Sequence, residues 1–62
     1  MAGMTEGRRA LLAVLQRTTA VYVAARCGVS PSRVSRWASG QGRPSARARA
    51  RLRDNYRIPD AW

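Results

Sequence analysis

Residues 19 to 40, TAVYVAARCGVSPSRVSRWASG, decide how this chain is expected to fold, because they predict two short helices joined by a tight turn. Thr19 can cap the first helix, since its hydroxyl can accept a hydrogen bond from a free amide of the first turn. Gly28 ends that helix, where the left-handed conformation is favoured and glycine has no Cβ to clash. Ser30 and Pro31 then start the second helix, as its N-cap and its first helical residue.

Apolar spacing assigns an inward and an outward face to each of these two helices. The inward side chains recur at helical spacing and are Val23, Ala24, Cys27, Val34 and Trp37. Val29 lies in the turn between the helices, where it can point inward. The second helix carries short hydroxyls and guanidiniums on its outward face, at Ser32, Arg33, Ser35 and Arg36. We therefore expect that face to make hydrogen bonds with a partner.

The same stretch contains the pattern Ala-x-x-x-Gly-Val-Ser-x-x-x-Val-Ser-x-Trp. Its defining positions are Ala24, Gly28, Val29, Ser30, Val34, Ser35 and Trp37. The pattern resembles the helix-turn-helix of the Cro and lambda-repressor-like DNA-binding family, and Ser39-Gly40 and Arg43-Pro44 resemble the loop that follows it there. The resemblance is strict over the motif and looser, in helix count and order, over the rest of the chain. One position departs from the family, because Ala20 stands where a glutamine often helps to hold a phosphate.

The resemblance implies an all-α fold, a compact lambda-repressor-like bundle of four to five helices forming a single DNA-binding domain over residues 1–62. It also implies that the helix over residues 31–39 lies in the major groove of double-stranded DNA. The base-facing positions are then Ser30, Pro31, Ser32, Arg33, Ser35 and Arg36. Arg36 is the first choice for a base, because a guanidinium can pair with both guanine acceptors, whereas Arg33 suits a base or a phosphate. The implied phosphate contacts, which orient the protein without reading sequence, are Thr19, Gly40, Gln41, Gly42 and Arg43.

Composition narrows the class of partner. The chain has 62 residues and a formal net charge of +9, with twelve arginines, no lysine and no histidine. A charge of that size on so short a chain indicates an anionic partner, either nucleic acid, an acidic protein or an anionic membrane surface. The lone Cys27 cannot form a disulfide framework or a metal cluster, and we expect it to be a small buried hydrophobe in a reducing cytosol. No stretch approaches the length of a membrane span, so we expect a soluble protein of the bacterial cytoplasm or nucleoid.

A helix is expected before the motif, from Glu6 to about Arg17, with Thr5 as its cap. Residues 1–4 are expected to be disordered. The inward side chains of this helix are Leu11, Val14 and Leu15. Its solvated side is expected to carry Arg8 and Arg9, and a phosphate contact from either one is the less favoured alternative.

A further helix is expected after the loop at 40–44, with Ser45 as its cap. The run ARARAR from Ala46 alternates with period two, as an edge strand does, but alanine and arginine are strong helix formers and β-branched residues are absent. The inward positions of this last part of the chain are Ala48, Leu52, Tyr56 and Ile58. A solvated or generally DNA-attracting face is expected from Arg47, Arg49, Arg51 and Arg53. Pro59 can start a turn that lets Trp62 fold back on the core.

An enzyme is not expected, since there is no histidine and no nucleophile beside a plausible base, and no cofactor or metal is predicted. The main interpretation is a sequence-specific DNA-binding protein, a Cro-like transcriptional repressor of phage or bacterial type that binds a palindromic operator as a homodimer. Residues 58–62 are the available dimer surface, in competition with folding back on their own core. The alternative is an antitoxin or adaptor-type protein-interaction module that uses Val21, Tyr22 or Trp62. A basic amphipathic membrane binder is disfavoured, because the arginines are spread around the expected fold.

Overall fold

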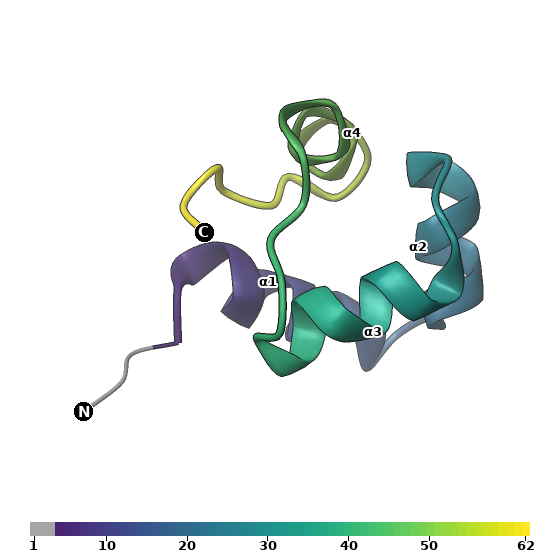
Figure 1. Cartoon of the computed structure of the whole chain (residues 1–62), viewed down its shortest axis with the longest axis horizontal. Helices are drawn as coiled ribbons and strands as arrows, with labels where there is room; N and C mark the ends of the chain where they lie inside the picture. The colour runs from purple at the N-terminus through teal and green to yellow at the C-terminus, as the bar shows by residue number, and fades with distance from the viewer. Residues whose placement is uncertain (1–3) are drawn as a thin grey trace.

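The structure is a computed structural model that describes residues 4–62, and over that range it contains four α-helices and no strand (Figure 1). The helices are α1 (Glu6–Leu15), α2 (Ala20–Cys27), α3 (Pro31–Ser39) and α4 (Ala46–Tyr56). The all-α prediction is confirmed, and the ARARAR run lies in a helix rather than in a strand. The expectation for residues 1–3 lies outside the described range.

The first helix is shorter than predicted, because it ends at Leu15 rather than near Arg17. The amides of Arg17 and Thr18 both donate to the carbonyl oxygen of Val14, at 2.9 and 3.1 Å. The bond from Arg17 reaches back only three residues, which tightens the last turn and stops the helix. The chain then turns directly into α2.

The helices α2, α3 and α4 begin, and α2 ends, at the capping residues that the sequence predicted. The hydroxyl oxygens of Thr5, Thr19 and Ser45 each accept a hydrogen bond from the amide three residues further on. Ser30 has the extended backbone of an N-cap, although its hydroxyl makes no cap hydrogen bond. Gly28 has a φ of 71°, the left-handed conformation that favours glycine. The predicted helix, turn and second helix are therefore all present.

One apolar cluster lies between the helices, and α3 contacts both α1 and α2. The buried members of this cluster are Leu11, Val23, Ala24, Cys27, Val34, Trp37, Ala48, Leu52 and Ile58. The sequence also predicts Val14, Leu15 and Val29 in the core, but these three are only half-buried and lie against the edge of the cluster. Val14 borders an open depression that it shares with Tyr56, so this end of α1 remains partly uncovered.

The segment after α4 returns to the start of α1, as Figure 1 shows. Arg57 ends α4 in the left-handed conformation, and Ile58 is then buried in the core. The amide of Gly7 donates to the carbonyl oxygen of Ala61 at 2.7 Å. The Trp62 ring lies against Gly7, since a Cβ added there would be 2.5 Å from its Cε2 atom. The predicted folding back of this segment is confirmed, and its large apolar side chains pack against other residues of the same chain.

Candidate nucleic-acid interface

The outward face of α3 is exposed, while its inward face holds the helix on the core. Val34 is fully buried and Trp37 is 5 % exposed, which fixes the rotation of the helix about its own axis. All of the predicted base-facing residues are exposed, namely Ser30, Pro31, Ser32, Arg33, Ser35 and Arg36. The first two turns of α3 therefore present exposed serine hydroxyls and guanidiniums on one side of the helix.

Polar side chains on this face have no partners in the part of the chain that the structure describes. Over residues 4–62, no hydrogen bond or ion pair involves the guanidiniums of Arg33 or Arg36. The Ser30 hydroxyl is equally unused, because it makes no cap bond. Hydroxyl and guanidinium donors held on a fixed helix without internal partners are available to hydrogen-bond the edges of bases.

The predicted phosphate contacts lie at the start of α2 and in the loop after α3, and all of them are exposed. The hydroxyl oxygen of Thr19 accepts the cap bond from the Tyr22 amide at 3.3 Å, which leaves the hydroxyl hydrogen free to donate. In the loop, the amides of Gly40 and Gln41 donate to carbonyl oxygens of α3, at 3.3 and 2.9 Å. These two amides close the end of the helix and are not free to bind a phosphate.

The loop retains other donors. Among the hydrogen bonds of residues 4–62, none uses the amides of Gly42 or Arg43. The side chains of Gln41 and Arg43 are likewise without a partner in that range. The donors of the loop that remain available to a phosphate are therefore the amides of Gly42 and Arg43 and the side chains of Gln41 and Arg43.

A model of the helix-turn-helix family matches residues 9–60. This chain belongs to the Cro/C1-type helix-turn-helix family. The family consists of DNA-binding transcription regulators and is not typically enzymatic, and its lambda-repressor-like fold agrees with the observed helices. No match was found among curated proteins or among solved structures. Every helix in the described part of the chain is too short or too polar to cross a membrane.

Arg8 of this helix-turn-helix protein does not lie on a solvated side, so the prediction for it is wrong. The residue is half-buried, and its Nε donates to the carbonyl oxygen of Ala38 at 2.7 Å. Its guanidinium lies on Gly40, where an added Cβ would be 3.1 Å from Cζ and from Nη1. Arg8 precedes the buried Leu11 by three residues, and this spacing is the signal that places its aliphatic stem on the inward side.

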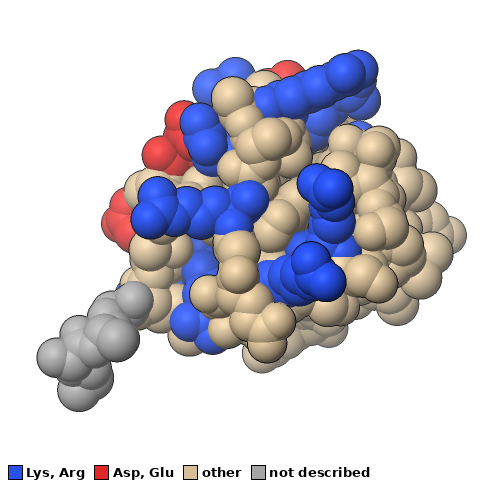
Figure 2. All heavy atoms as spheres, in the orientation of Figure 1, with Lys and Arg blue, Asp and Glu red and all other residues tan. Residues whose placement is uncertain are grey.

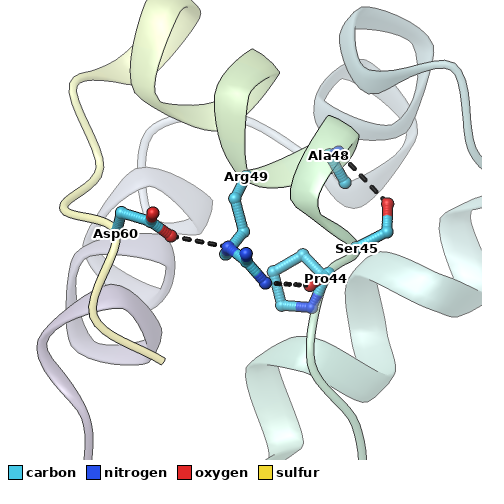
Figure 3. Close-up of polar contacts among 5 residues, drawn as sticks. All are labelled: Pro44, Ser45, Ala48, Arg49 and Asp60. Atoms are coloured by element: carbon cyan, nitrogen blue, oxygen red, sulfur yellow. Dashed lines mark hydrogen bonds and ion pairs between the residues drawn. The ribbon is translucent and has the colours of Figure 1, made fainter.

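Arg49 differs from its prediction in the same way (Figure 3). Its Nε lies 2.6 Å from Oδ1 of Asp60, and its Nη1 donates to the carbonyl oxygen of Pro44 at 3.2 Å. Arg49 also stands three residues before a buried leucine, Leu52. The guanidinium therefore links α4 to the C-terminal segment and to the loop after α3. The other arginines predicted on the solvated face of α4 are exposed, namely Arg47, Arg51 and Arg53.

Positive charge dominates the surface of the protein. Figure 2 shows basic side chains spread over the visible face, with the acidic side chains toward its left and upper edges. Within residues 4–62, the ion pairs join Arg49 to Asp60 and Arg53 to Asp54. The other guanidiniums have no carboxylate partner in that range, so the surface attracts polyanions.

Cys27 is buried, at 6 % exposed, as the sequence predicts. Burial raises the pKa of its thiol above the ordinary value of 9.0, and the positive charge of Arg51 opposes that shift. A buried, protonated thiol is a poor nucleophile and a poor metal ligand. In the described residues, no three histidine, cysteine, aspartate or glutamate side chains gather closely enough to hold a metal ion.

Proposed function

We propose that this protein is a Cro-like transcriptional repressor that binds a specific sequence of double-stranded DNA, with α3 in the major groove. The observation that carries the proposal is the unpartnered polar face of α3, which Val34 and Trp37 hold in one orientation. Membership of a family of DNA-binding regulators supports the same activity. In this proposal residues 1–62 act as one domain in the bacterial cytoplasm or nucleoid, without a cofactor.

Each side chain on the outward face of α3 has a role in this proposal. Arg36 pairs with the O6 and N7 atoms of a guanine, because its guanidinium matches two acceptors at once. Arg33 contacts a base or the adjacent backbone. The short residues Ser30, Pro31, Ser32 and Ser35 let the helix approach the base edges closely, and the three serine hydroxyls take single hydrogen bonds. Thr19, the side chains of Gln41 and Arg43, and the amides of Gly42 and Arg43 bind phosphates and set the register of the helix.

We also propose that two copies bind a palindromic operator, because one short reading helix contacts too few base pairs to select a site. The half-sites are then about one helical turn apart, roughly 34 Å. Residues 58–62 do not offer the apolar dimer surface that the sequence suggested, since Ile58 is buried and Trp62 lies against Gly7. The homodimer is therefore proposed to assemble on the DNA. A footprint that shows one chain on an asymmetric site would contradict this.

The test begins with selection of bound sequences from a pool of random duplexes. Affinities of the wild type, Arg36→Ala and Arg43→Ala are then measured on the selected duplex and on a random duplex at several salt concentrations. Arg36→Ala is expected to weaken the selected duplex by about 1–3 kcal/mol and to leave random binding nearly unchanged, because the lost contact is to a base. Arg43→Ala should weaken both duplexes similarly and lower the slope of log affinity against log salt by about one.

The control variant is Arg53→Ala, which removes the same charge from the exposed face of α4. Arg53→Ala should change the preference between duplexes less than Arg36→Ala does. It should also change the salt slope less than Arg43→Ala does. Equal weakening of both duplexes by Arg36→Ala would show that α3 does not read bases in the assigned way.

A protein-interaction module of the antitoxin or adaptor type is the second candidate, because Val21 and Tyr22 are 63 % and 64 % exposed on α2. Trp62 does not contribute to such a patch, since it lies against α1. This candidate is favoured if the wild type selects no sequence and binds every duplex with the same weak affinity.

A further inference from the structure

A positively charged pocket of about 310 Å³ lies at the junction of α1, the C-terminal end of α3 and the loop that follows it. Arg8 and Arg43 line it together with Gly40 to Gly42, and its other lining residues are Thr5, Trp37 and Trp62. We propose that this pocket binds one phosphate of the DNA backbone and that Arg8, from outside the helix-turn-helix motif, is one of its ligands. The proposal rests on the proposed function and adds α1 to the DNA interface.

Arg8 is held in place before any ligand arrives. Its Nε donates to the Ala38 carbonyl oxygen at 2.7 Å, a group that the end of a helix leaves without an amide partner. The guanidinium also lies on Gly40, whose φ of 82° favours glycine, and a Cβ there would be 3.1 Å from Cζ, which is tighter than an ordinary contact. This tether uses one nitrogen of the guanidinium. The two Nη groups have no acceptor in residues 4–62, and they form the paired donor edge that matches two oxygens of a phosphate.

The charges around the pocket favour the binding of an oxyanion. No aspartate or glutamate lines it, and neither Arg8 nor Arg43 forms an ion pair within the described residues. Arg49 and Arg53, in contrast, each have a carboxylate partner. Two positive side chains that share a pocket repel each other unless an anion lies between them. The unpaired amides of Gly42 and Arg43 add neutral donors of the kind that oxyanions accept.

The position of the pocket identifies the source of the phosphate. It begins where α3 ends, and a helix that enters the major groove meets the sugar-phosphate backbone as it leaves the groove. The pocket is therefore reached by the same duplex that the outward face of α3 contacts.

Phosphate ethylation interference on the selected duplex tests the proposal. Ethylation of a contacted phosphate inhibits binding, and a variant that lacks the contacting side chain becomes indifferent to that one ethyl group. Arg8→Ala is expected to lose interference at one phosphate, to bind selected and random duplexes about tenfold more weakly, and to show a salt slope lower by about one. The matched control is Arg9→Ala, the neighbouring exposed arginine of α1, which should keep the wild-type interference pattern.

Thermal unfolding of each variant shows whether it is folded at the assay temperature. If Arg8→Ala is not, Arg8→Lys decides, because it keeps the charge but replaces the planar guanidinium, whose separate nitrogens face Ala38 and the phosphate, with a single ammonium nitrogen. Arg8→Lys should then weaken both duplexes while keeping the wild-type salt slope. A wild-type interference pattern in Arg8→Ala, wild-type affinity in Arg8→Lys, or identical effects of Arg8→Ala and Arg9→Ala would overturn the proposal.

Failure here is distinguishable from failure of the proposed function. If Arg36→Ala loses discrimination between duplexes while Arg8→Ala retains the wild-type interference pattern, α3 reads bases and α1 takes no part. A wild-type protein that binds no duplex overturns both proposals.

Discussion

Gly7→Ala is expected to destabilise the protein, although alanine favours a helix more than glycine does. Gly7 lies in the first turn of α1, and an added Cβ would be 2.5 Å from Cε2 and 2.6 Å from Cδ2 of Trp62. Carbon atoms in ordinary contact are about 3.5–4.0 Å apart, so the indole ring has to move away from α1. The hydrogen bond from the Gly7 amide to Ala61 holds the same segment and weakens when the segment moves.

Two opposing contributions set the size of the effect. Alanine in place of glycine stabilises a helix by up to about 1 kcal/mol. Removing a fully buried tryptophan side chain costs about 3–5 kcal/mol, so the loss of contacts of the half-buried Trp62 costs roughly 2 kcal/mol. The net destabilisation is then about 1 kcal/mol, which lowers Tm by about 4–8 °C in a domain of this size.

A double-mutant cycle separates these contributions. Unfolding by heat and by urea is measured for the wild type, Gly7→Ala, Trp62→Ala and the double variant. Without the indole the clash is absent, so Gly7→Ala should stabilise the Trp62→Ala protein by up to about 1 kcal/mol, opposite in sign to its effect on the wild type. Equal stabilisation in both backgrounds would refute the contact between Trp62 and α1, and with it the wall of the proposed phosphate pocket.

Three further predictions concern the core, the loop and the thiol. Trp37→Ala should cost about 3–5 kcal/mol, enough to abolish a cooperative melting transition in circular dichroism; an unchanged Tm would place Trp37 on the surface. Arg49→Ala removes the ion pair to Asp60 and the hydrogen bond to Pro44, and should cost about 1–2 kcal/mol in urea unfolding, whereas Asp60→Asn should cost less because the second bond remains. Burial raises the pKa of Cys27, so the native state holds the thiol proton more tightly than the unfolded state, and stability should fall as pH rises above 9.0. Cys27→Ala should lack that decline. If the free energy of unfolding varied with pH in the same way in both proteins, the thiol would not be its cause.

The motif could be predicted from the sequence because its determinants are local. Gly28 at the end of α2 and Pro31 at the start of α3 act through backbone conformation within a few residues of themselves. The spacing of Val34 and Trp37 likewise fixes which face of α3 is buried, and therefore which side chains are exposed. The candidate base-facing surface follows from these features without knowledge of any long-range contact.

The environments of Arg8 and Arg49 could not be predicted in the same way, because their partners are distant in sequence. Arg8 bonds Ala38, and Arg49 bonds Asp60. Composition suggests that an arginine-rich helix has a solvated face, yet each of these arginines stands one turn before a buried leucine. Helical side chains lean toward the N-terminus, so a long stem at that position covers the core and brings its charged end to whatever backbone lies at the edge.

These two arginines also explain how a loop without secondary structure can hold proposed phosphate ligands in place. Arg8 bonds the carbonyl oxygen of Ala38, just before residues 40–43, and Arg49 bonds that of Pro44, just after them. The loop is thus fixed at one end from α1 and at the other from α4, while its own side chains stay exposed. Each of these guanidiniums has a second contact in a different direction. For Arg49 it is the ion pair with Asp60, and for Arg8 it is the proposed phosphate. A lysine ammonium carries the same charge but lacks the rigid, multi-donor plane that supports two such contacts at fixed angles. The positive charge of this chain therefore has two uses: inward arginines order the loop, outward arginines attract the duplex, and Arg8 is proposed to do both.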